Sequence, residues 1–246
     1  MRMSEVFNMN EEKKKKKFIF RFLFLISGLV ALTVILVTIY GQYTGTYLIG
    51  LTRDAEEKGI ILSTNYEFSN PQEKLIIDPV ENVLDMKFSW IKDKEAESTD
   101  GQFVDTEYPH YVAYTFYIKN IGNEIVDLDM RIQLISEYNS IGDATILRVR
   151  EFRDDNGNFN LIREVEYQKN LANNLYEGKI IGGSETTLSR MENFRVNEIR
   201  KFTIYLWVDG SLTNKDMMGG AIKFDFSFAI ATDLEEEIWK RFIFQC

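Results

Sequence analysis

Two hydrophobic patterns divide the chain. From Phe22 to Tyr40 the sequence runs for nineteen residues without a charge, and thirteen of these residues are Leu, Ile, Val or Phe. A helix of that length covers roughly 28 Å, about the thickness of the hydrocarbon core of a bilayer. Beyond Leu75 the apolar residues recur at every second position, which is typical of β-strands with one buried face. The pattern predicts a transmembrane helix over residues 22–46, followed by a β-rich body.

The charges are distributed unevenly around the apolar run. Residues 1–21 carry seven Lys or Arg, five of them consecutive from Lys13 to Lys17, and three Glu, a net charge of +4. Since the whole chain has a net charge of −9, the remaining 225 residues carry −13. Basic residues beside an apolar helix stay in the cytoplasm. We therefore expect residues 1–21 to be a basic cytoplasmic head and residues from about 47 onward to lie outside the cell.

Two other interpretations of the apolar run stay open, a buried helix in a soluble protein and the core of a cleaved signal peptide. The apolar core of a signal peptide usually has about 7–15 residues, fewer than this run has. The best substitute for an A-x-A cleavage site is Thr44-Gly45-Thr46. We expect a retained signal anchor of a single-pass cell-membrane protein, with the lipid bilayer as its partner through Phe22–Tyr40.

Residues 47–74 are predicted to be a connector and residues 75–232 an extracellular β-sandwich. In the connector, Asp54–Lys58 could add a helical turn that Gly59 ends. Strict alternation predicts strands at Leu84–Trp90, Val112–Ile118, Val126–Leu134, Phe202–Val208 and Ile222–Ile230. Weaker candidates are Thr145–Phe152, Asn158–Tyr167 and Gly178–Ile181.

Short turn sequences between these strands favour antiparallel pairing. Asn120-Ile121-Gly122-Asn123 and Asn156-Gly157 are predicted to close hairpins, and Asp209-Gly210 and Gly219-Gly220 to connect later strands. The predicted fold is mainly β: one N-terminal transmembrane helix and an antiparallel sandwich of jelly-roll or immunoglobulin-like type.

Residues 233–246 leave the alternating pattern. Leu234, Ile238 and Phe242 recur at every fourth position, and Asp233 can cap a helix that they would line. We expect a short amphipathic helix that covers an open end of the sandwich. Contact with the membrane and a final strand are the alternatives.

Candidate chemistry is sparse. His110 and Cys246 are the only residues of their types, which excludes an intramolecular disulfide and a multi-His or multi-Cys zinc site. A catalytic base also needs a nucleophile or a held water, so we expect a loop or rim position for His110. The acidic body argues against nucleic acid as a partner. We assign no catalytic, cofactor-binding or metal residue, and we expect no cofactor and no enzyme activity.

Three polar segments look like sites but are better explained otherwise. Asp154–Asn158 starts like a calcium loop, yet Phe159 and Val165 stand where an EF-hand needs Gly and Glu. A hairpin turn is the favoured interpretation, with a calcium site of another type as the alternative. Gly182–Thr187 lacks the lysine that a phosphate-binding loop needs. Glu235–Glu237 is expected to be surface charge.

The order of basic head, apolar helix and β-sandwich resembles that of the camelysin/TasA group of bacterial surface proteins. The local matches are the segments Tyr114–Leu128 and Ile222–Ile230. The resemblance implies a jelly-roll sandwich and, for some members, assembly into matrix fibres by lending a strand. Some members are classed as metallopeptidases, an activity that is not carried over, because no matching ligand set is present.

The expected function is that of a membrane-anchored cell-surface protein with a structural or binding β-sandwich. A protein partner, or a second copy, could add a strand at an exposed sheet edge. The alternatives are a cleaved matrix-fibre subunit of the camelysin/TasA type and an accessory subunit of a membrane complex.

Overall fold

A computed structural model of the chain describes residues 20–34, 47–80, 83–84, 86–169 and 185–231. Contacts divide the chain into two units, Met1–Thr44 and Gly45–Cys246. Four predicted features lie wholly or partly outside the described residues: the basic head up to residue 19, residues 35–46 of the transmembrane helix, the candidate strand Gly178–Ile181 and the tail 233–246.

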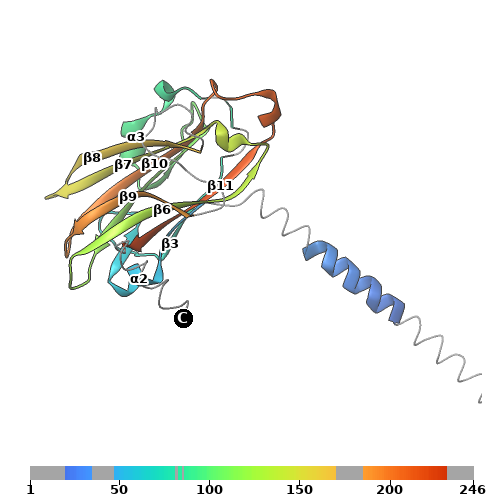
Figure 1. Cartoon of the computed structure of the whole chain (residues 1–246), viewed down its shortest axis with the longest axis horizontal. Coiled ribbons are helices and arrows are strands. Elements are labelled where there is room, and N and C mark those ends of the chain that lie inside the picture. Colours follow the sequence, from blue (N-terminus) through green and yellow to red (C-terminus); the bar gives the residue numbers. More distant parts are fainter. Residues whose placement is uncertain (1–19, 35–46, 81–82, 85, 170–184, 232–246) are drawn as a thin grey trace, which may run out of the picture. The chain divides into compact units, whose positions relative to one another are not determined.

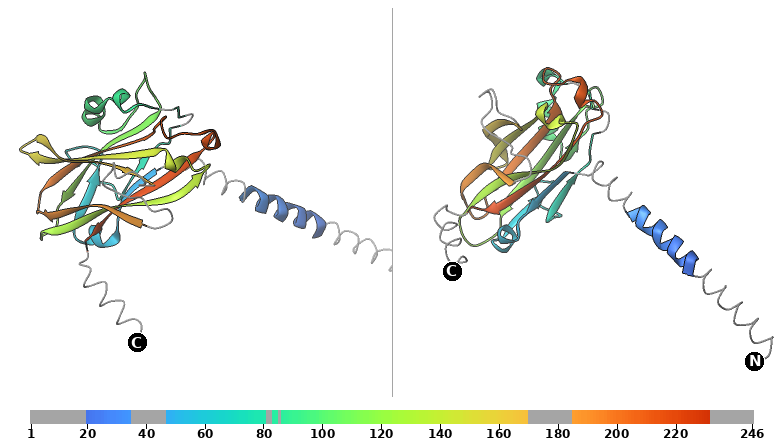
Figure 2. Two further views of the ribbon diagram at one scale, coloured as in Figure 1. Left: turned by 45° about the horizontal axis from the view of Figure 1, so that its top comes forward. Right: turned by 45° about the vertical axis from the view of Figure 1, so that its right-hand side comes forward.

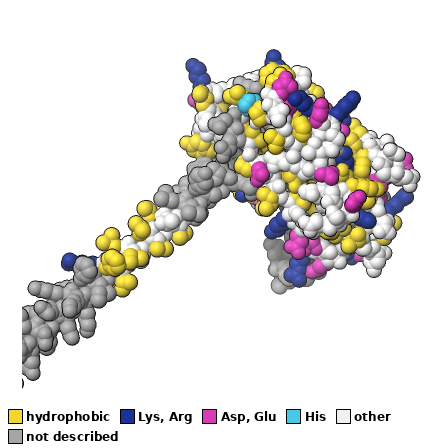
Figure 3. Space-filling model, turned by 180° about the vertical axis from the view of Figure 1, so that it is seen from behind, with side chains coloured by type: hydrophobic (Ala, Val, Ile, Leu, Met, Phe, Trp, Pro, Cys, Tyr) yellow, Lys and Arg dark blue, Asp and Glu magenta, His cyan; other side chains and the backbone are white. Residues whose placement is uncertain are grey.

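In the first unit, residues 20–34 are helical and exposed, with hydrophobic side chains along the surface (Figure 3). The Ser27 hydroxyl donates to the Phe24 carbonyl at 2.9 Å and the Thr33 hydroxyl to the Leu29 carbonyl at 2.9 Å, so both polar side chains are satisfied within the helix. In the portion of the chain that the structure describes, no helix has both the length and the apolar character needed to span a bilayer.

The second unit is mainly β and consists of two packed sheets (Figure 1). The five-stranded sheet has the order β3 (Lys74–Ile77), β1 (Tyr47–Leu51), β11 (Ala221–Ile230), β6 (Val126–Tyr138), β9 (Glu185–Phe194). The six-stranded sheet has the order β2 (Ile60–Ser63), β5 (Tyr111–Asn120), β10 (Ile199–Val208), β7 (Thr145–Asp155), β8 (Asn158–Gln168), and β4 (Gly101–Phe103) also pairs with β5. Short helical segments are α2 (Arg53–Glu57), η1 (Phe88–Trp90), α3 (Asp93–Ser98), η2 (Ile141–Asp143) and η3 (Lys215–Met217).

The core between the sheets is aromatic and aliphatic. The rings of Phe116 on β5 and Phe202 on β10 stack with centroids 5.4 Å apart, and Phe228 on β11 lies 5.9 Å and 5.4 Å from them. These three side chains are almost completely buried. The alternation seen in the sequence places them on facing sides of the two sheets, as predicted for a two-layer β fold.

The six-stranded sheet is buried on its outer face as well, which the sequence did not indicate. Nearly every residue of β5 and β10 is buried, including Thr115 and Thr203 between the apolar positions. The cover is the segment from Met86 to Ser98, with η1 and α3, which lies over the outer face (Figure 2). Thr115 donates to the Ala96 carbonyl of α3 at 2.9 Å and shares a 2.9 Å hydrogen bond with Thr203. The polar positions of these strands therefore face protein instead of water.

Residues 47–74, expected to be a connector, belong to the sandwich. β1 lies inside the five-stranded sheet, antiparallel to β3 and parallel to β11. Ile49 is fully buried there. The helical turn expected at Asp54–Lys58 is found as α2, and Gly59 follows it with φ +81°. Strands of four or five residues give too few alternations for the period to be recognised, and this explains the difference.

The expected hairpin at Asn120–Asn123 is wrong. β5 and β6 belong to different sheets, so the loop crosses from one layer to the other. The Asn120 side chain donates to the Glu124 carbonyl at 2.9 Å and the Phe194 carbonyl at 3.0 Å and accepts from the Gly122 amide at 2.9 Å. A Cβ on Gly122 would lie 2.0 Å from the Lys58 carbonyl oxygen, so this crossing requires glycine. The loop between β10 and β11, with Asp209-Gly210 and Gly219-Gly220, also changes layer.

The expected strand Leu84–Trp90 is also wrong. Its Met86 makes one bridge to Asp209, and Phe88–Trp90 is the 3₁₀ turn η1. β10 is already paired on both sides, by β5 and β7, so the segment cannot extend a ladder there and turns over the sheet face. In contrast, the candidate strands at Thr145–Phe152 and Asn158–Tyr167 are confirmed as β7 and β8.

Candidate functional site

An arginine cluster, which we define as Arg148, Arg150, Asp93, Glu97 and Glu164, joins α3 to the outer face of the six-stranded sheet. Arg148 and Arg150 alternate along β7, and Glu164 lies on the neighbouring β8. α3 brings Asp93 and Glu97, four residues apart, over the two guanidinium groups. Arg148 donates to Asp93, and Arg150 donates to Glu97. Glu164 lies 3.5 Å from Arg148 Nη1 and 3.2 Å from Arg150 Nε.

Aromatic rings enclose the Arg148 guanidinium. Its central carbon lies 4.5 Å from the Phe88 and Tyr205 ring centroids and 5.8 Å from that of Trp207. The side chain is fully buried. A buried cation is costly unless carboxylates and ring faces surround it, and both are present here. The arrangement clamps α3 and η1 onto the sheet.

Lys201 on β10 continues this row of cations. Its ammonium donates to the Glu97 carbonyl and lies 5.3 Å from the Phe152 ring centroid and 5.4 Å from that of Phe159. Burial lowers the pKa of Lys201, and burial raises the pKa of the Glu97 carboxyl. The outer-face cover thus removes most of the water around both charged groups.

A second ion pair lies on the inner face, at the end of the sandwich where β10 begins. Arg200 Nη1 donates to Glu151 Oε1 at 2.7 Å, and its Nε donates to Glu198 Oε1 at 2.6 Å. Arg200 and Glu151 are buried, and burial raises the pKa of Glu151. The pair neutralises two charges where the hydrophobic core ends.

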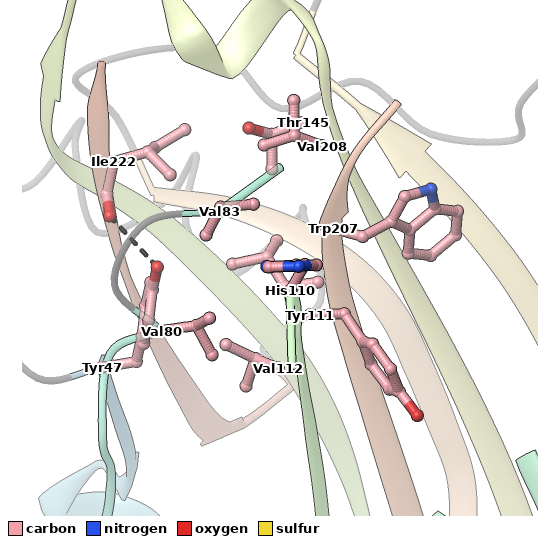
Figure 4. Close-up of a pocket in the computed structure, with 11 residues that line it drawn as sticks. Tyr47, Val80, Val83, His110, Tyr111, Val112, Thr145, Trp207, Val208 and Ile222 are labelled. Atoms are coloured by element: carbon pink, nitrogen blue, oxygen red, sulfur yellow. Dashed lines mark hydrogen bonds between the residues drawn. The ribbon is translucent and has the colours of Figure 1, made fainter. Parts of the chain in front are cut away.

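A small pocket lies at the opposite end, where β1, β5 and β11 begin (Figure 4). Apolar side chains of Val80, Val112 and Val208 form much of its wall, and the His110 imidazole lies among them. The cavity of about 40 Å³ has room for water molecules only. The Tyr47 hydroxyl at its edge donates to the Ile222 carbonyl at 3.2 Å, and burial raises the pKa of Tyr47 to about 12.

His110 directly precedes β5, as expected for a rim position, and its buried Nδ1 has no hydrogen-bond partner among the described residues. The nearby hydroxyl of Thr145 donates to the Ile141 carbonyl at 2.9 Å, and Tyr47 is engaged as described. The third residue with a hydroxyl in the pocket wall is Tyr111, and its hydroxyl donates to Asp105 Oδ2 at 3.1 Å. Within the described ranges, His110 therefore lies in an apolar wall and is not hydrogen-bonded to a nucleophile.

The Asp154–Asn158 segment is a hairpin turn, as predicted. Asn156 and Gly157 have φ values of +55° and +88°, the left-handed pair that a type I′ turn needs. Asp154 accepts from the Gly157 amide at 2.7 Å and from the Tyr66 hydroxyl at 3.2 Å. In the described ranges, no three His, Cys, Asp or Glu side chains come together as a metal site. Gly182–Ser184, Glu235–Glu237 and Cys246 lie outside those ranges.

The arginine cluster was missed in the sequence, although a signal was present. Arg148 and Arg150 alternate with the apolar residues of a predicted strand, and Asp93 and Glu97 have the i, i+4 spacing of one helix face. Each set alone is typical of a solvated surface. Only the tertiary contact between α3 and β7 makes them a buried network.

No family model matches the chain, and no curated protein matches it. Among solved structures, the β-glucosidase of Kluyveromyces marxianus in complex with glucose is similar at a TM-score of 0.25 and 16% sequence identity. The match covers 81% of this chain and 19% of that one, so the chain spans about a fifth of the glucosidase. A TM-score this low gives no support for a shared fold or activity.

Proposed function

We propose that this chain is a single-pass membrane protein that displays its β-sandwich outside the cell as a structural or binding module. The observation that carries the proposal is the sequence of parts: five lysines, an apolar run from Phe22 to Tyr40, and a sandwich whose first strand begins at Tyr47. At about −0.3 to −0.6 kcal/mol for each of the thirteen large apolar residues, insertion of the run is favoured by roughly 4–8 kcal/mol.

The membrane proposal is tested by alkaline carbonate extraction of membranes. Leu29→Lys with Leu32→Lys adds about 5–7 kcal/mol to the insertion free energy, which offsets most or all of the roughly 4–8 kcal/mol in favour of insertion. The unchanged chain should stay in the membrane pellet and the double variant should appear in the supernatant. Leu29→Ile with Leu32→Ile is the matched control and should pellet. Recovery of the unchanged full-length chain in the soluble fraction would overturn the proposal.

The orientation is tested by adding protease to intact cells. The positive-inside rule predicts that residues 45–246 are degraded while the N-terminal segment is protected. Replacing Lys13 to Lys17 with Gln should reverse or mix the orientation. Protection of the sandwich in the unchanged chain would show that the orientation is wrong.

The resemblance to the camelysin/TasA group makes release by cleavage the alternative. A cut between Thr44 and Tyr47 would leave β1 and the rest of the sandwich intact, because the second unit starts at Gly45. Mass measurement of the mature chain separates the two forms. A full-length mass supports the anchor, and an N-terminus near residue 47 supports the released subunit.

The proposed route to a protein partner is a sheet edge. β8 and β9 are the longest edge strands among the described residues, with 11 and 10 residues, but bulges interrupt both. The regular part of β8, from Arg163 to Gln168, is the edge we expect a second copy to use.

Self-association at β8 is tested by disulfide cross-linking in the full-length chain with Cys246→Ser. Ile162→Cys places a thiol beside the regular part of β8, and Ile76→Cys places one on β3 at the other side of the sandwich; both isoleucines are exposed. Dimers from Ile162→Cys alone support pairing at β8. Equal cross-linking at both positions, or none, contradicts it.

A further inference from the structure

The end of the sandwich that contains Tyr47, which we call the β1 end, collects several loops. The register places the start of β1 beside the end of β3 and near the start of β11. The Met86 amide donates to the Val208 carbonyl at 2.9 Å, and the Asn139 side chain donates to the Met218 carbonyl at 2.7 Å. The loop that follows β6 and the loop that joins β10 to β11 therefore meet at this end.

Exposed apolar side chains gather on these loops. Met218 is 77% exposed, Leu84 61% and Phe88 53%. Phe88 packs on Trp207 at the end of β10, with ring centroids 6.2 Å apart, so η1 belongs to the same end. Further exposed apolar residues here are Val83, Trp90, Tyr138 and Leu212. Large apolar side chains that project from loops into water indicate an interaction surface.

Basic side chains accompany the aromatic ones. Trp90 stacks on Tyr108 with centroids 5.1 Å apart, and the ammonium groups of Lys87 and Lys92 lie over these two rings at 5.7 Å and 6.0 Å. Lys215 begins η3 beside Met218. Aromatic rings and lysines with long apolar stems are the residues that suit the boundary between hydrocarbon and headgroups.

The length of the chain before β1 identifies the occupant of this surface. Seven residue steps separate Tyr40, the last residue of the apolar run, from Tyr47. Fully extended, they reach at most about 25 Å. If the run spans the bilayer, as proposed above, the β1 end can never move far from the lipid headgroups.

From these observations we infer that the β1 end rests on the outer surface of the bilayer, with Leu84, Met218 and Phe88 inserted among the lipids. This inference depends on the membrane anchor proposed above. The opposite end provides an internal comparison, because Ile121 there is 54% exposed and equally apolar but lies at the end of the sandwich away from Tyr47.

Site-specific fluorescence in full-length chain reconstituted into liposomes tests the inference. In a Cys246→Ser background, Leu84→Cys and Met218→Cys carry an environment-sensitive dye, and Ile121→Cys is the matched control. All three positions are exposed, so the substitutions should leave folding unchanged. The vesicles contain phosphatidylcholine and phosphatidylglycerol, with or without a nitroxide-labelled lipid.

Labels at positions 84 and 218 should be quenched at least threefold more by the nitroxide lipid than the label at position 121. Flotation of the vesicles reports the anchor separately. Flotation with equal quenching at all three positions overturns the inference and leaves the anchor intact, whereas a chain that does not float overturns both. Blue-shifted emission at 84 and 218 without lipid quenching also overturns it, and would indicate a second copy on this surface.

Discussion

The two faces of the six-stranded sheet are both buried, but by different chemistry. The inner face presents Phe116 and Phe202 to the facing sheet, and its stability comes from area removed from water. The outer face presents Arg148, Arg150 and Lys201 to α3, and its burial depends on each charge having a partner. An apolar face tolerates any well-packed cover, whereas a charged face accepts only a cover with complementary groups. α3 is therefore specified by charge more than by hydrophobicity.

The largest loss of stability is expected in the core, where the facing sheet packs on the inner face of the six-stranded sheet. Phe228→Ala removes a fully buried ring that contacts Phe116 and Phe202. The free energy of unfolding should fall by about 3–5 kcal/mol, because the cavity cannot fully collapse. Urea denaturation measures the change. The control is Ile76→Ala at an exposed position, and a loss there as large as that of Phe228→Ala would contradict the assignment of the core.

The second-largest loss in the free energy of unfolding is expected on the outer face, from Arg148→Met. The substitution keeps an apolar stem among the three rings but leaves Asp93 and Glu164 without this partner. We expect a loss of about 2–3 kcal/mol, less than for a fully buried pair because both carboxylates reach water in part. Urea denaturation gives the loss, and amide exchange in α3 should increase at the same time. An unchanged exchange rate in α3 would show that Arg148 does not hold the cover.

A smaller, pH-dependent effect is expected from Glu97→Gln. Because burial raises the folded-state pKa of Glu97, the folded protein binds a proton more readily than the unfolded chain does. The stability that protonated Glu97 contributes to the folded state is fully present below its unfolded pKa of about 4.3. It is lost as pH rises through the higher folded pKa. As pH falls from 7 toward this unfolded pKa, the wild-type chain should therefore gain stability relative to Glu97→Gln. Equal pH dependence of the two chains in thermal unfolding would contradict this.

The smallest effect is expected at a surface ion pair outside both faces. Arg53 Nε lies 2.9 Å from Glu57 on α2, and both side chains are mostly exposed. Arg53→Met should change the free energy of unfolding by less than about 0.5 kcal/mol, since solvent screens the pair. A change as large as that of Arg148→Met would remove the distinction between buried and exposed charges.

The alternating periods predicted the long strands well because side chains on a strand obey a period of two wherever one face is buried. They did not identify β1, β2 and β3, which are too short. They also missed β9, because bulges in this strand shift its register with β6 between Val126 and Leu128 and between Met130 and Arg131. The turn Asn156-Gly157 was predictable because its backbone conformation depends on those two residues alone. The Asn120–Asn123 loop was not, since a turn sequence does not say whether the next strand pairs or changes layer.

The candidate site was harder to predict than the fold. His110 at the rim followed from its place before a strand. The enclosure of Arg148 did not, because an arginine between apolar residues is usually solvated. Its burial results from a segment fifty-five residues away in sequence.

The parallel pairing of β1 with β11 has a consequence for biogenesis. Leu48 to Leu51 align with Asp225 to Phe228, so the first strand of the sandwich gains its second neighbour only from β11, the last described strand. During synthesis, one side of the β1 backbone therefore stays without its strand partner until some 170 further residues have followed. The five-stranded sheet can be completed only after β11 has been made, near the end of the described sequence.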